Sequence, residues 1–493
     1  MKVLVANRGE IAIRILRACR DLGVPSVAVY SEADREALHV RYANEAVCIG
    51  PAAAAQSYLN IARVLDAARR TGASLVHPGY GFLSENPDFA RAVEDAGLTF
   101  VGPRPETMAQ VGDKLAARRA AREEGLPVLP GPDEPLTEVA LTAEAARQVP
   151  YPVLVKATAG GGGRGIRLAR TPEELVEMVA AARREAQAAF GDATVYLEPL
   201  VQRARHIEVQ ILGDGAGHVL CLGERECSIQ RRRQKLVEEA PAPGLTDAQR
   251  GYIFDAAARL ARALNYRSLG TVEFLLDEDG QFHFIEVNPR IQVEHPVTEM
   301  VTGLDLVKEQ LRLAAGRPLR YAQEYITSRG AAIEARVLAE DPAQGFLPAT
   351  GEITYLKEPG GPGIRVDSAL YAGLAVTADY DSLLAKVIAW GENRPVAILR
   401  LRRALREFHI AGVPTDLEFL FQVVDSSPFI VGNVDTTYLD TFRPPPSANR
   451  VLERDAALAA AILAHRQRGA SRAAPSAESN AWRTTAWREQ MGR

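Results

Sequence analysis

Two strand-like segments near the middle of the chain, each with acidic residues among apolar ones, most constrain how it can fold. Thr271–Leu276 and Gln281–Val287 are rich in β-branched and aromatic residues. Asp277–Gly280, between them, has the composition of a turn. We therefore expect these residues to form a β-hairpin.

Polar side chains gather on one face of this hairpin. If the strands pair directly outward from the turn, Glu273 faces Phe284, and Glu286 is its diagonal neighbour, roughly 7–8 Å away. Asn288 points the same way in a continuing strand. Two carboxylates and an amide oxygen on an apolar sheet require a cation, because like charges there repel or stay protonated. Hard oxygen donors suit Mg²⁺, which keeps water and phosphate oxygens as further ligands. The alternative is a surface carboxylate pair neutralised by Arg290.

A glycine-rich segment lies between two further strand-like runs. A strand that ends near Lys156 leads into Gly160–Gly163, and a second short strand, Ile166–Leu168, follows. Helix signals begin only at Thr171, an N-cap whose capping box is completed by Glu174. The segment lacks a GK[ST] ending and opens no helix, so it is neither a Walker A loop nor a dinucleotide fingerprint. A strand–loop–strand order fits a lid over a polyphosphate, although a flexible surface loop is the alternative. Four consecutive glycines cost roughly 0.5–1 kcal/mol each relative to alanine, which favours function.

Eight segments together resemble the ATP-grasp superfamily, and within it the biotin carboxylase branch, over about residues 2–442. In order along the chain they are NRGEIAIRILRA, HPGYGFLSEN, VGDK, KATAGGGGRG, RHIEVQ, ERECSIQRR, FIEVNPRIQVEHPVTE and GFLPATG. Without this resemblance, the spacing of the residues indicates only an enzyme that uses ATP and a metal ion.

The resemblance implies a multidomain α/β and α+β protein with three domains. Residues 1–110 form a doubly wound parallel α/β domain, residues 111–316 an ATP-grasp module whose glycine-rich lid covers about 129–201, and residues 317–442 an α+β domain. Residues 443–493 would then be one helix, about Val451–Arg468, and a tail that its composition predicts to be disordered.

Local patterns indicate several elements of the outer domains. The third domain is expected to end with a charged helix, Pro395–Phe408. In the first domain, a helix from about Glu10 to Leu22 accompanies four short apolar strands: Val3–Ala6, Ser26–Val29, Leu75–Val76 and Thr99–Val101.

Composition narrows the possible functions. A net charge of −4 and a pI near 6.2 give no electrostatic reason to bind nucleic acid. The four cysteines form no C-x-x-C pattern, no apolar run is long enough for a membrane span, and we expect no signal peptide, so a reducing cytoplasm is predicted. Neighbouring Arg225 and Arg231 would lower the pKa of Cys227, but we assign this thiol no catalytic role.

The resemblance assigns a nucleotide-binding set and a metal-binding set. Lysines, lid glycines, a hinge strand against adenine, and polar residues of the sheet would contact ATP: Lys114, Lys156, Gly162, Gly163, Glu198, Pro199, Leu200, Val201, His206, Gln230, Arg233, Glu273, Leu275 and Glu286. Glu273, Glu286 and Asn288 would bind two Mg²⁺ or Mn²⁺ ions.

The resemblance also assigns a bicarbonate and biotin pocket. Its residues would be Lys235, Arg290, Gln292, Val293 and Glu294, with Arg336 and Tyr80 at the biotin ureido ring. Among these, Glu294 would be the general base that removes the bicarbonate proton, Arg290 and Lys235 would hold the anion, and Arg336 would stabilise charge on the ureido oxygen.

Two positions depart from the family pattern. Arg233 stands where a histidine that contacts the ribose is usual, and an arginine donates hydrogen bonds but accepts none. Pro362 stands where relatives have an aromatic residue near the dimer contact. Ribose recognition and dimerisation are the properties that these two residues affect.

The activity implied is ATP- and bicarbonate-dependent carboxylation of biotin through carboxyphosphate, as in the first half-reaction of acetyl-CoA carboxylase. No A-M-K-M-like site occurs in the chain, so the biotin is expected on a separate carrier protein, with carboxyltransferase subunits as further partners and a homodimer as the assembly. The alternatives are the corresponding subunit of a pyruvate, propionyl-CoA or methylcrotonyl-CoA carboxylase, another ATP-grasp carboxylate–amine ligase, and a non-catalytic nucleotide-binding protein.

Overall fold

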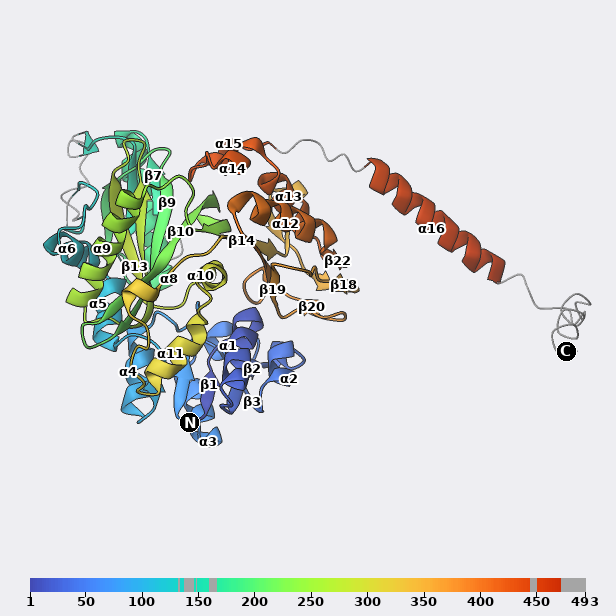
Figure 1. Ribbon diagram of the computed structural model, residues 1–493, viewed down its shortest axis with the longest axis horizontal. Coiled ribbons are helices and arrows are strands. Elements are labelled where there is room, and N and C mark those ends of the chain that lie inside the picture. Colours follow the sequence, from blue (N-terminus) through green and yellow to red (C-terminus); the bar gives the residue numbers. More distant parts are fainter. Residues whose placement is uncertain (132–133, 137–145, 148, 159–165, 444–449, 471–493) are drawn as a thin grey trace, which may run out of the picture. The chain divides into compact units, whose positions relative to one another are not determined.

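The computed structural model describes residues 1–131, 134–136, 146–147, 149–158, 166–443 and 450–470 (Figure 1). The chain divides into two compact units, Met1–Phe442 and Arg443–Arg493. None of the helices formed by the described residues is long and apolar enough to cross a bilayer. The mixed α/β architecture comprises three domains, all within the first unit, as the sequence predicted.

The first domain is built on a parallel sheet of five strands in the order β3-β2-β1-β4-β5. Val3 and Val5 face helices α1 (Gly9–Asp21) and α11 (Leu306–Ala314), whereas Leu4 faces α3 (Ile61–Thr71) and α4 (Pro87–Asp95), so helices cover both sides of the sheet. This is the doubly wound arrangement that the sequence predicted. The strands are β1 (Val3–Val5), β2 (Ser26–Ser31), β3 (Glu45–Gly50), β4 (Leu75–His77) and β5 (Thr99–Phe100).

The four predicted strands of this sheet are present, with ends that differ by one or two residues. The predicted helix is α1, Gly9–Asp21. Strand β3 was not predicted, because it is an edge strand whose first half is exposed and therefore lacks a continuous apolar run. The other helices of this region are α2 (Leu38–Tyr42), α3 (Ile61–Thr71), α4 (Pro87–Asp95), α5 (Pro105–Gly112) and α6 (Lys114–Glu123).

A single antiparallel sheet of eight strands runs from the second domain into the third, in the order β13-β12-β9-β10-β11-β14-β21-β19. The junction is the pairing of β11 with β14. The strands are β9 (Arg205–Asp214), β10 (Val219–Arg231), β11 (Gln234–Ala240), β12 (Arg267–Leu276), β13 (Phe282–Asn288), β14 (Ala331–Leu338), β19 (Ile364–Ser368) and β21 (Leu383–Gly391).

The two faces of this sheet differ in chemistry. Ile207 and Val272 belong to the apolar face, which packs on α9 (Asp247–Ala263). In the third domain, α12 (Arg394–Glu407) and α13 (Leu417–Val424) cover the sheet. The opposite face is polar, and α10 (His295–Thr302) packs across its middle. Side chains from both domains therefore meet beneath α10.

The predicted hairpin is β12–β13, but its predicted register was wrong. Leu276 pairs with Phe282, and a register shift then places Glu273 directly opposite Glu286. The prediction pairs Glu273 with Phe284, because it assumes that the strands pair directly outward from the turn. The turn is one residue longer than this, since Leu276 pairs with Phe282 and not with Gln281, and a bulge between Glu273 and Phe274 then adds one more residue.

The two strands that flank the glycine-rich segment belong to a separate sheet of three antiparallel strands, in the order β7-β6-β8. Strands β6 (Val153–Ala157) and β7 (Ile166–Ala169) form the predicted strand–loop–strand unit, and β8 (Val195–Pro199) completes the sheet. Gly162 and Gly163 lie outside the described residues.

The helix after this unit, α8 (Pro172–Phe190), begins as predicted, because the Thr171 side chain accepts a hydrogen bond from the Glu174 N–H. The Glu174 carboxylate reaches one residue further back than a capping box requires, to the N–H of Arg170 at 2.7 Å.

The third domain does not end with the charged helix α12, contrary to the prediction. Strand β22 (His409–Ala411) and three helices follow, and the Phe429 side chain is buried in the domain core. The apolar runs in these elements after α12 are too short to show a helical period in the sequence. The remaining elements are α11 (Leu306–Ala314), α14 (Ser427–Val431), α15 (Tyr438–Thr441), β15 (Glu340–Asp341), β16 (Leu347–Pro348), β17 (Gly351–Glu352), β18 (Tyr355–Lys357) and β20 (Ala375–Val376).

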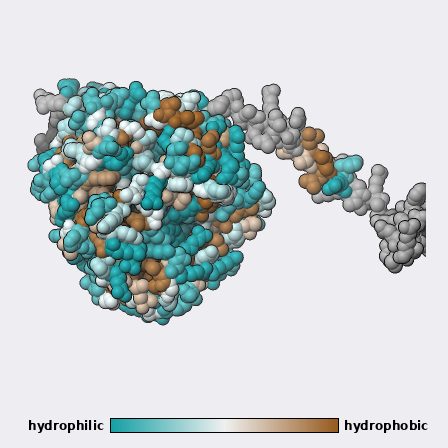
Figure 2. Space-filling view, in the orientation of Figure 1, coloured by the Kyte–Doolittle hydropathy of each residue, from teal (hydrophilic) through white to brown (hydrophobic). Residues whose placement is uncertain are grey.

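Helix α16 (Arg450–Ala470) is the described part of the second unit and matches the predicted helix to within two residues at each end. Leu458, Ile462 and Leu463 are more than half exposed on it. On the face of the first unit visible in Figure 2, polar and apolar side chains are interspersed, whereas apolar residues gather on this helix. The predicted disordered tail, 471–493, lies outside the described residues.

Candidate active site

The polar face of the eight-stranded sheet collects the side chains that the sequence singled out. Directly paired residues point to the same side of a sheet. Glu208 pairs with Glu273 across β9 and β12, and Glu273 pairs with Glu286 across β12 and β13. Three carboxylates from three neighbouring strands are therefore adjacent on one face, and their charge has to be neutralised.

Lys235 of β11 is the cation at the centre of this group. Its Nζ donates to Glu208 at 2.6 Å, to Glu273 at 2.9 Å and to Glu294 at 2.8 Å. Burial lowers the pKa of Lys235, but the three carboxylates outweigh burial and raise it well above the ordinary value. The ammonium group thus links the hairpin carboxylates to Glu294.

Glu294 is fully buried at the N-cap of α10. Besides Lys235, it accepts a hydrogen bond from Arg336 Nη2 at 2.8 Å. Burial opposes ionisation, but Lys235, Arg336 and Arg225 together hold the pKa of Glu294 well below its usual range. This carboxylate is therefore ionised and is held by cations from two domains.

Arg290 follows β13 and holds two oxygen atoms of the site in place. Its Nε donates to Glu85 at 2.5 Å, its Nη1 to Gln292 Oε1 at 2.5 Å and its Nη2 to Asn288 Oδ1 at 3.2 Å. Gln292 Nε2 in turn donates to Glu273 at 3.3 Å. A planar guanidinium of this kind presents several donors to an anion.

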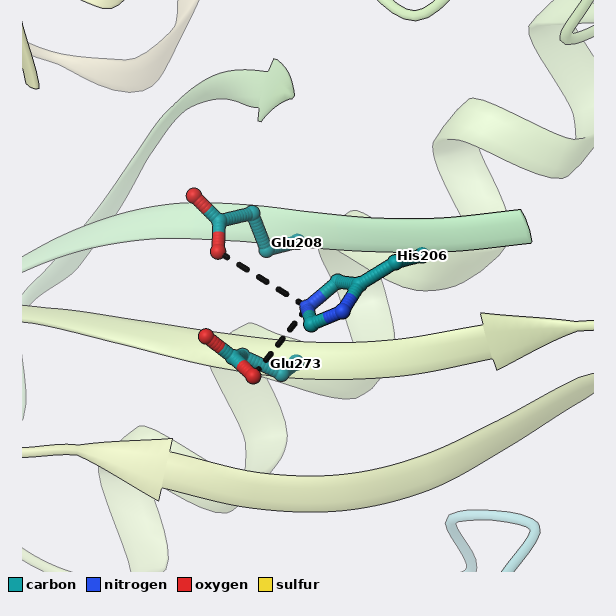
Figure 3. Close-up of side chains that lie close together, drawn as sticks. All are labelled: His206, Glu208 and Glu273. Atoms are coloured by element: carbon teal, nitrogen blue, oxygen red, sulfur yellow. Dashed lines mark ion pairs between the residues drawn. The ribbon is translucent and has the colours of Figure 1, made fainter. Parts of the chain in front are cut away.

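His206, Glu208 and Glu273 form a compact group on strands β9 and β12 (Figure 3). The imidazole Nε2 lies 3.1 Å from Glu273 Oε2 and 4.0 Å from Glu208 Oε2. Gln230 Nε2 contacts the other ring nitrogen at 2.9 Å. Because an amide N–H₂ only donates, the ring nitrogen that faces Gln230 accepts, and the ring proton lies toward Glu273.

The chemistry of the hairpin fits a divalent cation. Burial raises the pKa of Glu273, but Lys235 and His206 lower it, so Glu273 is ionised and its charge is balanced by Lys235. Burial raises the pKa of Glu286, and Lys114, 3.8 Å away, only partly offsets this effect. A half-buried carboxylate whose charge is balanced only in part is a suitable hard ligand for Mg²⁺. The third predicted ligand, Asn288, turns its Nδ2 toward Glu273 (3.0 Å) and its Oδ1 toward Arg290.

Lys114 and Lys156 lie at the junction between the large sheet and the three-stranded sheet. Lys156 of β6 forms a buried ion pair with Glu198 of β8, and Arg118 donates to the other Glu198 oxygen at 2.9 Å. The backbone N–H of Lys114 donates to the carbonyl of Thr158 at 3.2 Å. Strand β6 is thereby tied to the start of α6.

The remaining predicted nucleotide contacts surround this junction. The Arg233 guanidinium donates to the Ile166 carbonyl at the start of β7 (3.1 Å), which shows that an arginine can occupy this position as a donor. Leu275 lies beside His206 on the polar face. Pro199 ends β8, and Leu200 and Val201 follow it.

The two residues predicted to face biotin come from different domains, Tyr80 from the first and Arg336, on β14, from the third. Tyr80, in the loop after β4, donates from its hydroxyl to Glu10, and Lys386 Nζ lies 5.9 Å from the centre of its ring. Lys386 Nζ also donates to the carbonyl of Val293 at 2.8 Å, so a buried lysine of the third domain holds the segment that is predicted to bind bicarbonate.

The sequence interpretation missed several charged residues that the structure places at this site. Glu85 holds Arg290, Arg118 holds Glu198, and Lys386 holds Val293. Arg225 donates to Glu208 at 2.5 Å, to Gln210 at 2.7 Å and to Thr298 at 2.9 Å. The alternation of His206, Glu208 and Gln210 along one strand was the available signal for Arg225, because a buried row of polar groups needs a charged partner.

The predicted effect on Cys227 was wrong. Burial and the nearby Glu208 raise the pKa of this thiol well above its ordinary value, and Lys235 offsets them only in part. Arg225 is engaged by Glu208 and Arg231 by Glu340, so neither guanidinium activates the sulfur.

Comparison with known sequences supports the same architecture. Residues 1–108 match the family "Biotin carboxylase, N-terminal domain", residues 113–322 "Carbamoyl-phosphate synthase L chain, ATP binding domain", and residues 334–441 "Biotin carboxylase C-terminal domain". The biotin carboxylase of Nostoc is 52% identical over 438 residues, which are 89% of this chain and 98% of the relative.

Two solved structures are similar throughout the first unit. The β-γ-ATP complex of biotin carboxylase from Campylobacter jejuni has a TM-score of 0.87 at 42% identity, over 90% of this chain and 98% of the other. The biotin carboxylase domain dimer of Hydrogenobacter thermophilus 2-oxoglutarate carboxylase, with MgADP, ADP and bicarbonate, has a TM-score of 0.86 at 48% identity over 89% and 97%.

The fold and the site together define an ATP-dependent carboxylase of the ATP-grasp class. The chain belongs to the biotin carboxylase family.

Proposed function

We propose that this protein uses ATP and bicarbonate to carboxylate biotin carried by a separate protein. The observation that carries the proposal is the position of Lys235, which contacts Glu273 at the hairpin and Glu294 beneath α10 with one ammonium group. An anion bound at Lys235 would lie between a metal–nucleotide site on the hairpin and Arg336 on β14.

The hairpin would bind the metal and the nucleotide phosphates. Glu273 and Glu286, with Asn288 after rotation of its amide, would hold Mg²⁺ or Mn²⁺, and the ion would neutralise charge on the ATP phosphates. Lys114 and Lys156 would contact the same phosphates, beneath a lid containing Gly162 and Gly163. Glu198–Val201, His206, Gln230, Arg233 and Leu275 would surround the nucleoside. The magnesium ADP complex of the Hydrogenobacter domain supports this assignment.

The bicarbonate site would make the carbon electrophilic. Glu294 would remove the bicarbonate proton while Arg290, Lys235, Gln292 and the Val293 backbone hold the anion. The bicarbonate oxygen would then attack the γ-phosphorus, ADP would leave, and the product would be carboxyphosphate.

The biotin site would receive the carbon. Carboxyphosphate would break down to CO₂ and phosphate, and biotin N1′ would transfer its proton to this phosphate and attack the CO₂. Negative charge then develops on the ureido oxygen, and Arg336 would stabilise it as a preorganised donor. Tyr80 would form one wall of the pocket.

Bicarbonate-dependent ATP hydrolysis that increases with free biotin is the test. Purified protein with Mg-ATP and ¹⁴C-bicarbonate should release phosphate and yield acid-labile labelled biotin. An ATP-grasp carboxylate–amine ligase would require an amine and would not respond to biotin, and a non-catalytic nucleotide-binding protein would release no phosphate. Either result would contradict the proposal.

The carboxyl acceptor is proposed to be acetyl-CoA, with a biotin carboxyl carrier protein and carboxyltransferase subunits as partners. A domain from a 2-oxoglutarate carboxylase is 48% identical, so similarity at this level accompanies different acceptors. Co-purification of the native complex and an assay of its carboxyltransferase would distinguish acetyl-CoA from pyruvate, propionyl-CoA and methylcrotonyl-CoA.

We further propose a homodimer and the domain boundaries 1–110, 111–316 and 317–442. The dimer of the Hydrogenobacter domain supports the homodimer, and the residues matched by the three families support the domain boundaries. Analytical ultracentrifugation at several protein concentrations tests the homodimer. Cytoplasmic location stays a prediction.

A further inference from the structure

Two buried glutamates beneath α10 have no part in the reaction described above. Glu238 of β11 and Glu334 of β14 pair directly across the junction between the second and third domains. Both side chains are fully buried, and none of their four oxygens has a hydrogen bond of ordinary geometry to the residues that the structure describes, although Glu238 forms an ion pair with Arg336. Buried carboxylates without hydrogen bonds are rare and costly, so each requires an explanation.

Glu238 shares one nitrogen of Arg336 with Glu294. Arg336 Nη2 lies 2.5 Å from Glu238 Oε1 and 2.8 Å from Glu294 Oε2. Arg336 follows Glu334 by two residues on β14, so both lie on the polar face of the sheet. The guanidinium is therefore held between a carboxylate of the bicarbonate pocket and a carboxylate outside it.

We propose that Glu238 is a positioning residue that holds Arg336 away from full pairing with Glu294, so that its guanidinium remains directed at the biotin ureido oxygen. This inference rests on the proposed function. When Glu238 is ionised, its charge competes with Glu294 for Arg336. When Glu238 is neutral, Arg336 pairs with Glu294 alone, and both groups become less available to their substrates.

The groups around Glu238 make its ionisation sensitive to pH near neutrality. Burial and Glu294 raise its pKa, Arg336 and Lys235 lower it, and the net result is a pKa of about 7. The other groups that face it are Glu334 from β14, Lys235 from β11 and Cys227 from β10. Burial raises the pKa of Glu334 and of Cys227 well above their ordinary values, which favours the neutral form of both groups.

The sign of the pH effect follows from this arrangement. Above about pH 7 Glu238 carries its charge and holds Arg336, and below that pH it is protonated and releases Arg336. The kcat for biotin carboxylation should therefore fall as the pH decreases through about 7, whereas the KM for Mg-ATP should not follow it, because Arg336 lies outside the nucleotide site.

The experiment compares Glu238→Gln with a matched control, Glu239→Gln. Glu239 is the next residue on β11, is also buried, and pairs with Arg394 on the other face of the sheet. At pH 8, Glu238→Gln is expected to lower kcat for biotin carboxylation about tenfold, with the KM for Mg-ATP within twofold of wild type. The inflection near pH 7 should disappear in Glu238→Gln and remain in Glu239→Gln.

A conservative variant provides a second measurement if Glu238→Gln is recovered in low yield. Glu238→Asp keeps the charge at a shorter reach, so it should retain the inflection and recover part of kcat. Wild-type kcat and pH profile in Glu238→Gln would overturn the proposal, and so would a parallel loss in kcat and in Mg-ATP affinity, which indicates general damage. Failure of the proposed function is a different result, namely the absence of biotin-stimulated ATP hydrolysis in the wild-type protein.

Discussion

Glu273 and Glu286 face each other across β12 and β13 at the point where the register of the hairpin shifts. The two carboxylates have opposite electrostatic environments. Lys235 and His206 lower the pKa of Glu273 despite its burial, whereas burial raises the pKa of Glu286. The charge of Glu273 is thus balanced by Lys235, whereas that of Glu286 is balanced only in part by Lys114 at 3.8 Å, so a divalent cation would complete it.

Replacing Glu286 with glutamine should therefore weaken metal binding. The neutral amide removes the charge that a divalent ion would neutralise, so the Mg²⁺ concentration for half-maximal ATP hydrolysis should rise at least about tenfold, or about 1.4 kcal/mol. Titration of ATP hydrolysis with Mg²⁺ measures this, and EDTA should abolish the activity. Glu278→Gln, at the exposed turn of the same hairpin, is the control. An unchanged magnesium requirement in Glu286→Gln would remove Glu286 from the metal site.

Replacing Arg336 with alanine should suppress biotin carboxylation at least about a hundredfold, because one preorganised donor to a developing oxyanion contributes roughly 3–4 kcal/mol. The KM for Mg-ATP should stay near the wild-type value. Steady-state kinetics with free biotin measures both quantities. Arg336→Lys should restore little, because an ammonium lacks the planar pair of donors. Normal turnover in Arg336→Ala would exclude Arg336 from the mechanism.

Replacing Glu294 with alanine should abolish bicarbonate-dependent ATP hydrolysis while Mg-ATP still binds. Loss of a general base typically costs about 10²–10⁴ in rate. Isothermal titration with Mg-ATP and phosphate release with bicarbonate separate the two effects. A large loss of Mg-ATP affinity would instead place Glu294 on the metal.

The stability of the protein should decrease between about pH 6.5 and pH 4 because of His39. Burial lowers the pKa of this imidazole; Asp34 raises it by less, Arg8 lowers it, and the net result is a pKa of about 4. In this pH window the unfolded state binds a proton that the folded state does not, so unfolding becomes more favourable as the pH falls. The free energy of unfolding should fall by about 3 kcal/mol in total, and this loss is complete below pH 4.

Calorimetric melting temperatures across that window measure the effect. In His39→Gln, the melting temperature should fall less between pH 6.5 and pH 4 than in wild type, because the protonation of His39 no longer contributes. His409→Gln, at an exposed position on β22, is the control and should melt like wild type at every pH. Identical pH dependence in His39→Gln and wild type would show that His39 is not held neutral.

Ending the chain after Arg443 should leave biotin carboxylation within about twofold of the full-length rate. Every described residue of the candidate site lies in the first unit, which has its own hydrophobic clusters. Rates measured side by side for the two lengths test this. A larger loss would assign a catalytic or assembly role to the segment 444–493.

Much of the fold could be predicted from local patterns. Short apolar strands between helices gave the doubly wound domain, and Thr171 gave the start of α8, because apolar periodicity and capping are properties of neighbouring residues. The short helices after α12 and the edge strand β3 were missed, since neither has a complete apolar period. The alternation of polar residues placed Glu273, Glu286 and Asn288 on one face, but it could not reveal the bulge that sets Glu273 against Glu286.

The sequence by itself determined the hairpin, the strand–glycine–strand unit, the family, and the chemical types of the site residues. Only the tertiary structure decided which of these residues touch. Strand β11 brings Lys235 and Glu238, its partner β14 brings Arg336, and α10 places Glu294 above them. The pairing of strands about 100 residues apart depends on packing of the whole sheet, and local periodicity carries no information about it.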